Sequence, residues 1–128
     1  MANLTTYTKD LLYNAMIGGK GLAPPTQLYI ALSTTPTDDA GSITEPGGTY
    51  ARQPILMGPP SAGQGVNVGV SDFGTNTTGD TITITHAAIF DALVGGNMVK
   101  HAAVISPLAV LDTQTYSVPA GNLTLLFI

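Results

Sequence analysis

The segment Thr81–Ile105 constrains the fold most, because it has the pattern of two strands joined by a tight turn. In its first arm, apolar residues at even positions alternate with threonines at odd positions, which predicts a strand with one buried and one exposed face. Residues 95–97 (GGN) tolerate the left-handed backbone that a hairpin turn needs. The second arm, Met98–Ile105, is again apolar and β-branched, and Pro107 is expected to end it. The segment therefore predicts a central hairpin in an all-β fold.

Residues 5–17 are expected to form the one helix of the chain. Apolar residues recur there at helical spacing, Thr5 or Thr6 can cap the start, and the pair at 18–19 (GG) can close the end. We expect this helix to pack across an open end of the sheets. The alternative is a helix that reaches towards a partner.

Short strands are expected at residues 27–32, 49–57, 66–70 and 122–128, and another is expected to follow a turn near Asp112 and to run through Val118. Turns rich in glycine and proline separate these strands. In the first of these strands only one face is expected to be buried, and Pro54 indicates an edge strand or a bulge in the second. The last strand is apolar on both faces, which is typical of a central strand or of one pressed against another subunit. With about seven or eight strands and no internal repeat, we predict one β-sandwich domain over residues 1–128, jelly-roll-like, with the N-terminal helix.

The chain carries unusually little charge. Charged residues make up 9% of the sequence, against about 25% in an ordinary soluble domain, and the net charge is −4. Part of the surface is therefore expected to be covered by other chains, although a surface of Thr, Ser, Asn and Gly is the alternative. With only four cationic side chains there is no basic patch for nucleic acid, and the apolar runs are too short to cross a bilayer.

Residues that carry chemistry are few. His86 and His101 lie one on each arm of the hairpin, where two rings can share a metal. However, His86 has the parity of the apolar residues, Ile82, Ile84, Ala88 and Phe90, so we expect a hydrogen-bonded core histidine, and no third ligand has suitable spacing. The chain has no cysteine and no G-x-S-x-G elbow. We therefore expect no catalytic residue, no metal, no cofactor and no enzymatic activity.

The polar segment Ser33–Gly48 is expected to be a solvated loop. Its carboxylates are an alternative cation site, but their spacing is not that of a calcium loop. Arg52, the only arginine, is suited either to a two-bond pair with a partner's carboxylate or to bracing its own loop. The candidate interface residues are Arg52, Asp38, Asp39, Glu45, Leu126 and Ile128.

Three segments in order carry a family resemblance: an N-terminal helix ending in GG, then LYIALSTTPT followed by EPGGTYAR, then THAAIFDALVGGNMV. In this respect the chain resembles a family of small tailed-bacteriophage virion proteins. Its members are often labelled tail fibre proteins and in some phages are identified as capsid cement or decoration proteins. The resemblance implies a structural protein without catalytic residues, a β-sandwich that forms oligomers on the outside of a virion.

From the resemblance and the low charge we expect a capsid cement or decoration protein on the outer surface of the phage head. It would bind the major capsid protein across the seams between capsid subunits, and itself as a dimer or trimer, with no nucleic acid or membrane partner. The alternative is a tail-fibre or tail-tip component that recognises a host surface through Ser33–Gly48, with Tyr29 and Tyr50 as exposed aromatics. The small number of aromatic residues favours cement over this alternative.

Overall fold

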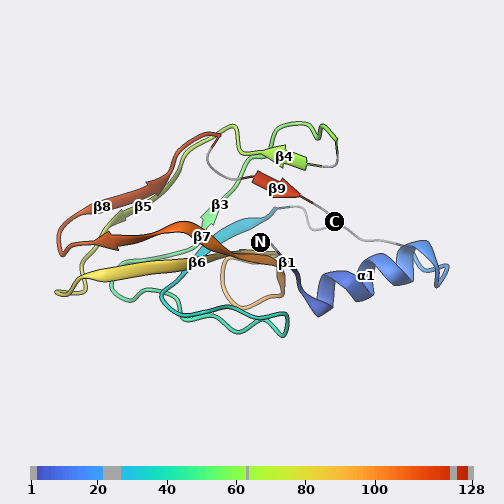
Figure 1. Ribbon diagram of the computed structural model, residues 1–128, viewed down its shortest axis with the longest axis horizontal. Coiled ribbons are helices and arrows are strands. Elements are labelled where there is room, and N and C mark those ends of the chain that lie inside the picture. Colours follow the sequence, from blue (N-terminus) through green and yellow to red (C-terminus); the bar gives the residue numbers. More distant parts are fainter. Residues whose placement is uncertain (1–2, 22–26, 63, 122–123, 127–128) are drawn as a thin grey trace.

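The computed structural model describes residues 3–21, 27–62, 64–121 and 124–126 (Figure 1). One helix and nine strands are found in these ranges: β1 (Asn3–Leu4), α1 (Thr6–Met16), β2 (Tyr29–Ser33), β3 (Gln53–Pro54), β4 (Gln64–Val66), β5 (Ser71–Thr75), β6 (Ile82–Phe90), β7 (Met98–Val110), β8 (Thr115–Val118) and β9 (Thr124–Leu126). A five-stranded sheet has the order β1-β7-β6-β2-β3, and β4–β9 and β5–β8 form two smaller sheets. Neighbouring strands are antiparallel throughout.

The hairpin of β6 and β7 lies at the centre of the large sheet, because β6 pairs with β7 on one side and with β2 on the other. Gly95 and Gly96 have φ angles of 64° and 72° in the loop between the two strands, as predicted for the turn. The expectation of a mostly β chain with one N-terminal helix is confirmed. The order of the described strands does not show a jelly roll.

The buried face of β6 changes part-way along the strand. Ile82, Ile84 and Ile89 belong to the main core, whereas Ala88 and Phe90 belong to a second cluster on the other side of the sheet. The pairing register with β7 shifts directly after Ile84, because β6 advances two residues from Ile84 to His86 while β7 goes from Leu108 to Ala103. A shift by an odd number of residues moves the side chains that follow to the opposite face. The expectation that one parity is buried along the whole strand is therefore wrong.

The same irregularity explains Pro107, which was expected to end the second arm. Ile84 pairs with Leu108, but the next paired residue, His86, faces Ala103, so residues 104–107 have no register partner on β6. Proline lacks the N–H that a ladder needs, and a bulge is a position where this costs little. Strand β7 therefore continues past Pro107 to Val110.

The main core lies between the five-stranded sheet and the β5–β8 sheet. The rings of Tyr50, Phe73 and Tyr116 stack in a column, with centroids 5.6 Å apart at each step. Strand β5, which carries Phe73, was not expected from the sequence, because residues 72–80 are rich in Gly, Thr and Asn. The buried members of this core are Ile30, Leu32, Ile55, Phe73, Ile82, Ile84, Ile89, Val110 and Tyr116.

The other side of the large sheet is covered by the long 33–48 segment. Ile43 from this segment packs against the second cluster, which consists of Ala31, Ala88, Phe90 and Met98. Strand β2 is therefore buried on both faces, and the expectation of a half-buried strand is wrong. The expectation of a solvated loop holds only in part, since Pro46 is also buried.

The prediction of an edge strand at Pro54 is confirmed, whereas the valines at positions 66, 68 and 70 lie on an exposed side. Pro54 lies in β3, the edge strand, as expected, although β3 covers only two residues of the expected 49–57 strand. Val66, Val68 and Val70 share one side as predicted, but it is the exposed side. Asn67 between them is buried instead, and its side-chain N–H donates to the carbonyl oxygen of Pro119 (2.9 Å).

Helix α1 is attached to the sheet through its first turn. The hydroxyl of the N-cap Thr5 donates to the Met98 carbonyl, and the Thr8 hydroxyl donates to the Val99 carbonyl (2.7 Å). Figure 1 shows the rest of α1 extending beyond the sheets, so the expectation that it packs across their open end is wrong. Met16 and Ile17 are exposed at its far end. In the described part of the chain, no helix is both long and apolar enough to cross a membrane.

Candidate interaction surface

The loop at residues 91–97, between β6 and β7, presents two apolar side chains to solvent. Leu93 is 49% exposed and Val94 is 85% exposed. Both ends of the loop are tied together, because the Asn97 backbone N–H donates to the Asp91 carboxylate (2.7 Å) and the Asp91 N–H donates to the Asn97 carbonyl (3.1 Å). At Gly96 a side chain would lie 2.5 Å from the Asp91 carboxylate, so the closed loop requires glycine there. The apolar tip is thus held in one conformation.

Arg52 supports this loop from beneath. Its Nη1 donates to the carbonyl oxygens of Ala92 (3.0 Å) and Gly95 (2.7 Å), while Nε and Nη2 each donate to the Glu45 carboxylate at 3.0 Å. The guanidinium carbon lies 3.6 Å from the centroid of the Phe90 ring, and only 8% of Arg52 is exposed. Of the two roles suggested by the sequence, the structure thus shows the bracing of its own chain. A contact of Arg52 with a partner stays a prediction.

Tyr50 completes the anchorage of Glu45. Its hydroxyl donates to the Glu45 carboxylate (2.9 Å) and accepts the backbone N–H of Leu32 (2.9 Å). Burial raises the pKa of the Tyr50 hydroxyl above its ordinary value, with the negative charge of Glu45 acting in the same direction. Tyr50 therefore stays a neutral donor at physiological pH, and it is not the exposed aromatic that the sequence suggested.

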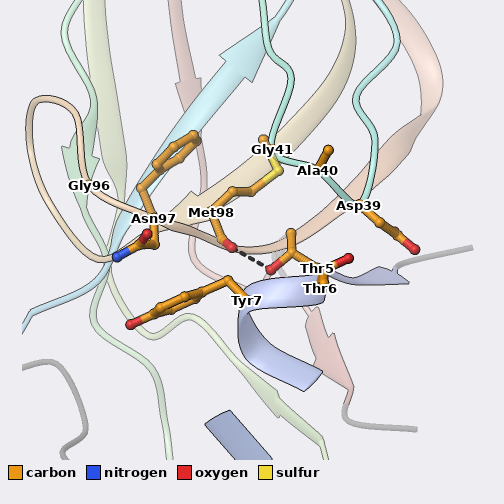
Figure 2. Close-up of a pocket in the computed structure, with 10 residues that line it drawn as sticks. Thr5, Thr6, Tyr7, Asp39, Ala40, Gly41, Gly96, Asn97 and Met98 are labelled. Carbon is orange, nitrogen blue, oxygen red and sulfur yellow. Dashed lines mark hydrogen bonds between the residues drawn. The ribbon is translucent and has the colours of Figure 1, made fainter. Parts of the chain in front are cut away.

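Shallow clefts lie on both sides of the 91–97 loop. One, of about 360 Å³, lies between the loop tip and the segment that carries Glu45 and Arg52. The other, of about 390 Å³, is lined by the end of the loop, by the first turn of α1 and by residues 39–41 (Figure 2). In that view Tyr7 and Asn97 lie on one side of the cleft, and Asp39 lies on the other. We call the 91–97 loop together with these two clefts the hairpin-loop surface.

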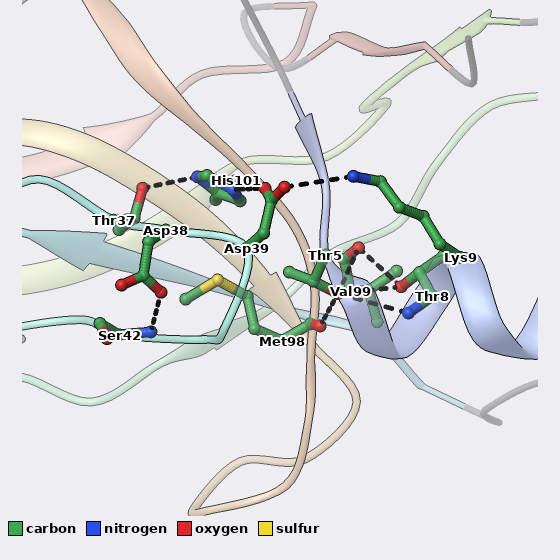
Figure 3. A network of polar contacts seen from close by, with 10 residues as sticks. All are labelled: Thr5, Thr8, Lys9, Thr37, Asp38, Asp39, Ser42, Met98, Val99 and His101. Carbon is green, nitrogen blue, oxygen red and sulfur yellow. Dashed lines mark hydrogen bonds and ion pairs between the residues drawn. The ribbon is translucent and has the colours of Figure 1, made fainter.

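A polar network joins three elements next to this surface (Figure 3). The Asp39 carboxylate bonds to His101 Nε2 (2.8 Å) and to Lys9 Nζ (3.1 Å), and the other ring nitrogen of His101 bonds to the Thr37 hydroxyl (2.9 Å). The backbone carbonyl of Asp39 also accepts the N–H of Thr6 (3.0 Å). The bond from His101, followed by that from Lys9, lowers the pKa of Asp39. Asp39 thus fastens the start of α1 to β7.

The three carboxylates of the 33–48 segment do not converge on one point. Asp38 accepts the backbone N–H of Ser42 (2.9 Å), a bond that lowers the pKa of Asp38. Asp39 is held by His101 and Lys9, as described above, and Glu45 is paired with Arg52. Among the described residues no group of three or more His, Cys, Asp or Glu side chains is arranged to hold a metal ion.

The burial of the two histidines differs from the expectation for His86. His101 is the buried one, 7% exposed, with both ring nitrogens bonded. His86 is half-buried and bonds to the neighbouring Thr85 hydroxyl (2.9 Å), because the register shift after Ile84 removes it from the main core face. The expectation of a core position for His86 is therefore wrong.

Two candidate interface residues, Leu126 and Ile128, lie at the C-terminal end of the chain. The backbone of Leu126 lies in β9, where it pairs with Gln64, which confirms a paired final strand but not a central one. The Leu126 side chain and Ile128 lie outside the described residues. Sequence reasoning did not select Leu93 and Val94, although an apolar pair directly before two turn glycines is a signal for an exposed hairpin tip.

Comparison with known families decides the class of protein. The chain matches the family described as Gp80, podophage GP4 fiber I protein gp80, over residues 3–126, which is nearly its full length. The chain belongs to this phage fibre protein family. A comparison with curated proteins finds no match.

Membership in the Gp80 family makes this chain a structural protein of the virion and not an enzyme. It supports the resemblance to tailed-phage virion proteins that the sequence showed. The family is one of fibre proteins, so it favours the tail-fibre alternative over the capsid cement expected from the low charge. The hairpin-loop surface is accordingly considered below as a contact surface and not as a catalytic site.

Proposed function

We propose that this Gp80 family member is a component of the tail fibre, and that it contacts a neighbouring virion chain through the hairpin-loop surface. The observation that carries the proposal is the family match over residues 3–126. The low charge of 9% supports it, because a fibre subunit covers part of its surface with other subunits.

The geometry of the 91–97 loop suits such a contact. Association costs conformational entropy wherever a loop must be ordered on binding, and a loop that is already rigid avoids that cost. The bonds of Arg52, Asp91 and Asn97 hold Leu93 and Val94 in place before any partner arrives. The apolar tip can insert into a pocket of the partner, and the cleft beside it can bind a side chain of the partner.

The location in the virion tests the first part of the proposal. Gold-labelled antibodies against this protein should mark the tail vertex of intact particles, in the few copies that a fibre requires. Antibodies against the major capsid protein serve as the control that marks the whole head. Hundreds of copies spread over the head would overturn the fibre assignment and favour a capsid cement protein. If the protein is a cement protein, DNA-filled heads that lack it should break at a lower temperature.

The contact surface needs a separate test. Phage that produce Val94→Asp should assemble heads normally but incorporate less of this protein, because a carboxylate placed in an apolar contact must lose its hydration. Ile105→Asp is the matched control, since Ile105 is fully exposed in the β7 bulge, away from the loop. Equal incorporation of both variants would exclude the hairpin-loop surface as the contact while leaving the fibre location intact.

A further inference from the structure

The guanidinium of Arg52 keeps one hydrogen-bond donor that the described chain does not use. A guanidinium carries five N–H groups, one on Nε and two on each terminal nitrogen. Arg52 donates once from Nε, twice from Nη1 and once from Nη2. The second N–H of Nη2 therefore has no acceptor among the described residues. Because only 8% of Arg52 is exposed, this charged donor is largely shielded from water, and an acceptor from outside would complete its hydrogen bonding.

Arg52 lines the cleft of about 360 Å³ beside the loop tip. Its guanidinium is fixed there before any ligand arrives, because it lies 3.6 Å from the centroid of the Phe90 ring and is bonded to both the loop and Glu45. Apolar side chains form much of the cleft wall, and they are those of Pro46, Ala51, Leu93 and Val94. The cleft thus combines a rigid donor with a surface that favours an apolar ligand.

The charge beside this donor selects a neutral acceptor. The Glu45 carboxylate accepts from Arg52 Nε and Nη2 at 3.0 Å, so the pair carries no net charge. An incoming carboxylate or phosphate would be repelled by Glu45, whereas a carbonyl oxygen accepts a charge-assisted bond without this repulsion. A sugar would leave most of its hydroxyls against the apolar wall without a polar partner. A peptide supplies both groups that fit, a neutral carbonyl oxygen and an apolar side chain.

We propose that this cleft binds a peptide segment of the neighbouring virion chain, with the unused N–H of Arg52 Nη2 donating to a carbonyl oxygen of that segment. An apolar side chain of the same segment packs against Leu93 and Val94. The inference rests on the proposed function, because it takes the hairpin-loop surface as the contact. It adds the chemistry of the partner and the atom of this chain that recognises it.

Filling the cleft tests its use. Ala51 is exposed and lines the cleft, so Ala51→Phe should block it and leave every side-chain bond of Arg52 in place. Phage that produce Ala51→Phe should incorporate roughly tenfold less of this protein. Ala109→Phe is the matched control, because Ala109 is exposed on β7 and lines neither cleft, and its incorporation should be normal. Thermal unfolding checks that both variants fold.

The Val94→Asp phage separate a failure of this inference from a failure of the proposed function. If Val94→Asp lowers incorporation but Ala51→Phe does not, the hairpin loop is the contact and the cleft is not, which overturns the inference alone. If neither variant lowers incorporation, the hairpin-loop surface is not the contact, and both proposals are wrong.

A small peptide mimic tests the hydrogen bond itself. N-acetyl-leucine N-methylamide carries neutral carbonyl groups and an apolar side chain, whereas N-acetyl-leucine ends in a carboxylate. Added to the full isotope-labelled chain, the amide should shift the NMR signals of Arg52 Nε–H and the Gly95 N–H, with a dissociation constant on the order of 10 mM. The carboxylate should shift them less, and Ala51→Phe should abolish the response. No saturable shift with the amide, or a larger shift with the carboxylate, would overturn the inference.

Discussion

The guanidinium of Arg52 donates two hydrogen bonds of 3.0 Å to the carboxylate of Glu45. Its third nitrogen, Nη1, donates to two backbone carbonyl oxygens of the hairpin loop. The only arginine of the chain is therefore used inside the protein. Its bonds cross 7 residues of sequence to Glu45 and 43 residues to Gly95, so one side chain ties the 33–48 segment to the β6–β7 hairpin.

Replacing Arg52 with alanine should lower the free energy of unfolding by about 3 kcal/mol, because the buried end of an ion pair and two carbonyl oxygens lose their donor together. Urea unfolding followed by circular dichroism measures the loss. Arg52→Lys keeps the charge but not the planar fork, so an intermediate loss is expected. A loss for Arg52→Ala as small as that for the exposed Lys20→Ala would contradict the bracing role.

The two turn glycines should respond differently to alanine. At Gly95 nothing lies within 4 Å of a new Cβ, so Gly95→Ala should cost only the left-handed backbone penalty of about 1 kcal/mol. At Gly96 the new Cβ would lie 2.6 Å from the Ala92 Cβ as well as against Asp91, so Gly96→Ala should cost at least about twice as much. Thermal unfolding of both variants makes the comparison, and equal losses would show that the loop opens freely.

Asn76 joins two turns at the far end of the sheets, and its loss should be costly. Its side-chain N–H groups donate to the carbonyls of Asp80 (2.8 Å) and Val110 (2.9 Å), and it is 1% exposed. Asn76→Ala leaves both carbonyls without these donors, so we expect a loss of about 2–3 kcal/mol in urea unfolding. Thr83→Ala, an exposed change on β6, should cost far less. Similar values for the two variants would contradict this account.

The attachment of α1 should weaken in acid. The folded pKa of Asp39 lies below its ordinary value of 3.8, so the folded state binds the proton less tightly than the unfolded state. The stabilisation by Asp39 is therefore complete above that ordinary value and is lost as the pH falls through the lowered pKa. The pKa of Asp38 is also lowered, so Asp38 contributes a pH dependence of the same sign, but this contribution is the same in the unaltered protein and in an Asp39 variant.

Comparing the unaltered protein with Asp39→Asn isolates this effect. The difference in unfolding midpoint should be full near about pH 7 and should shrink as the pH falls below 3.8. Asp80→Asn is the control, because the bonds that the structure shows for Asp80 are made by its backbone, which Asn retains: the carbonyl oxygen accepts from Asn76 and Thr78, and the N–H donates to the Thr78 hydroxyl. A difference between the unaltered protein and Asp39→Asn that does not change with pH would show that the charge of Asp39 does not hold the helix.

Local signals in the sequence were sufficient for several elements. Thr5 caps α1 and Gly95 and Gly96 turn the hairpin, because capping and left-handed backbone depend on residues next to one another in the chain. The edge position of Pro54 also follows from a property of one residue, its missing N–H. The exposure of Val66, Val68 and Val70 could not be predicted in this way. An alternating sequence shows that the two faces of a strand differ, but not which face packs against the core.

The amino-acid sequence alone was enough to predict a β-rich, charge-poor chain with one capped helix, a glycine hairpin and the features of a phage virion protein. The folded protein was needed to find which way β6 faces after Ile84, that Arg52 pairs with its own Glu45, and that α1 extends away from the sheets. The two groups of features differ in how far apart along the chain the interacting residues lie. Turns and caps arise from neighbouring residues, whereas a bulge, an ion pair and the direction of a helix depend on which distant segments pair.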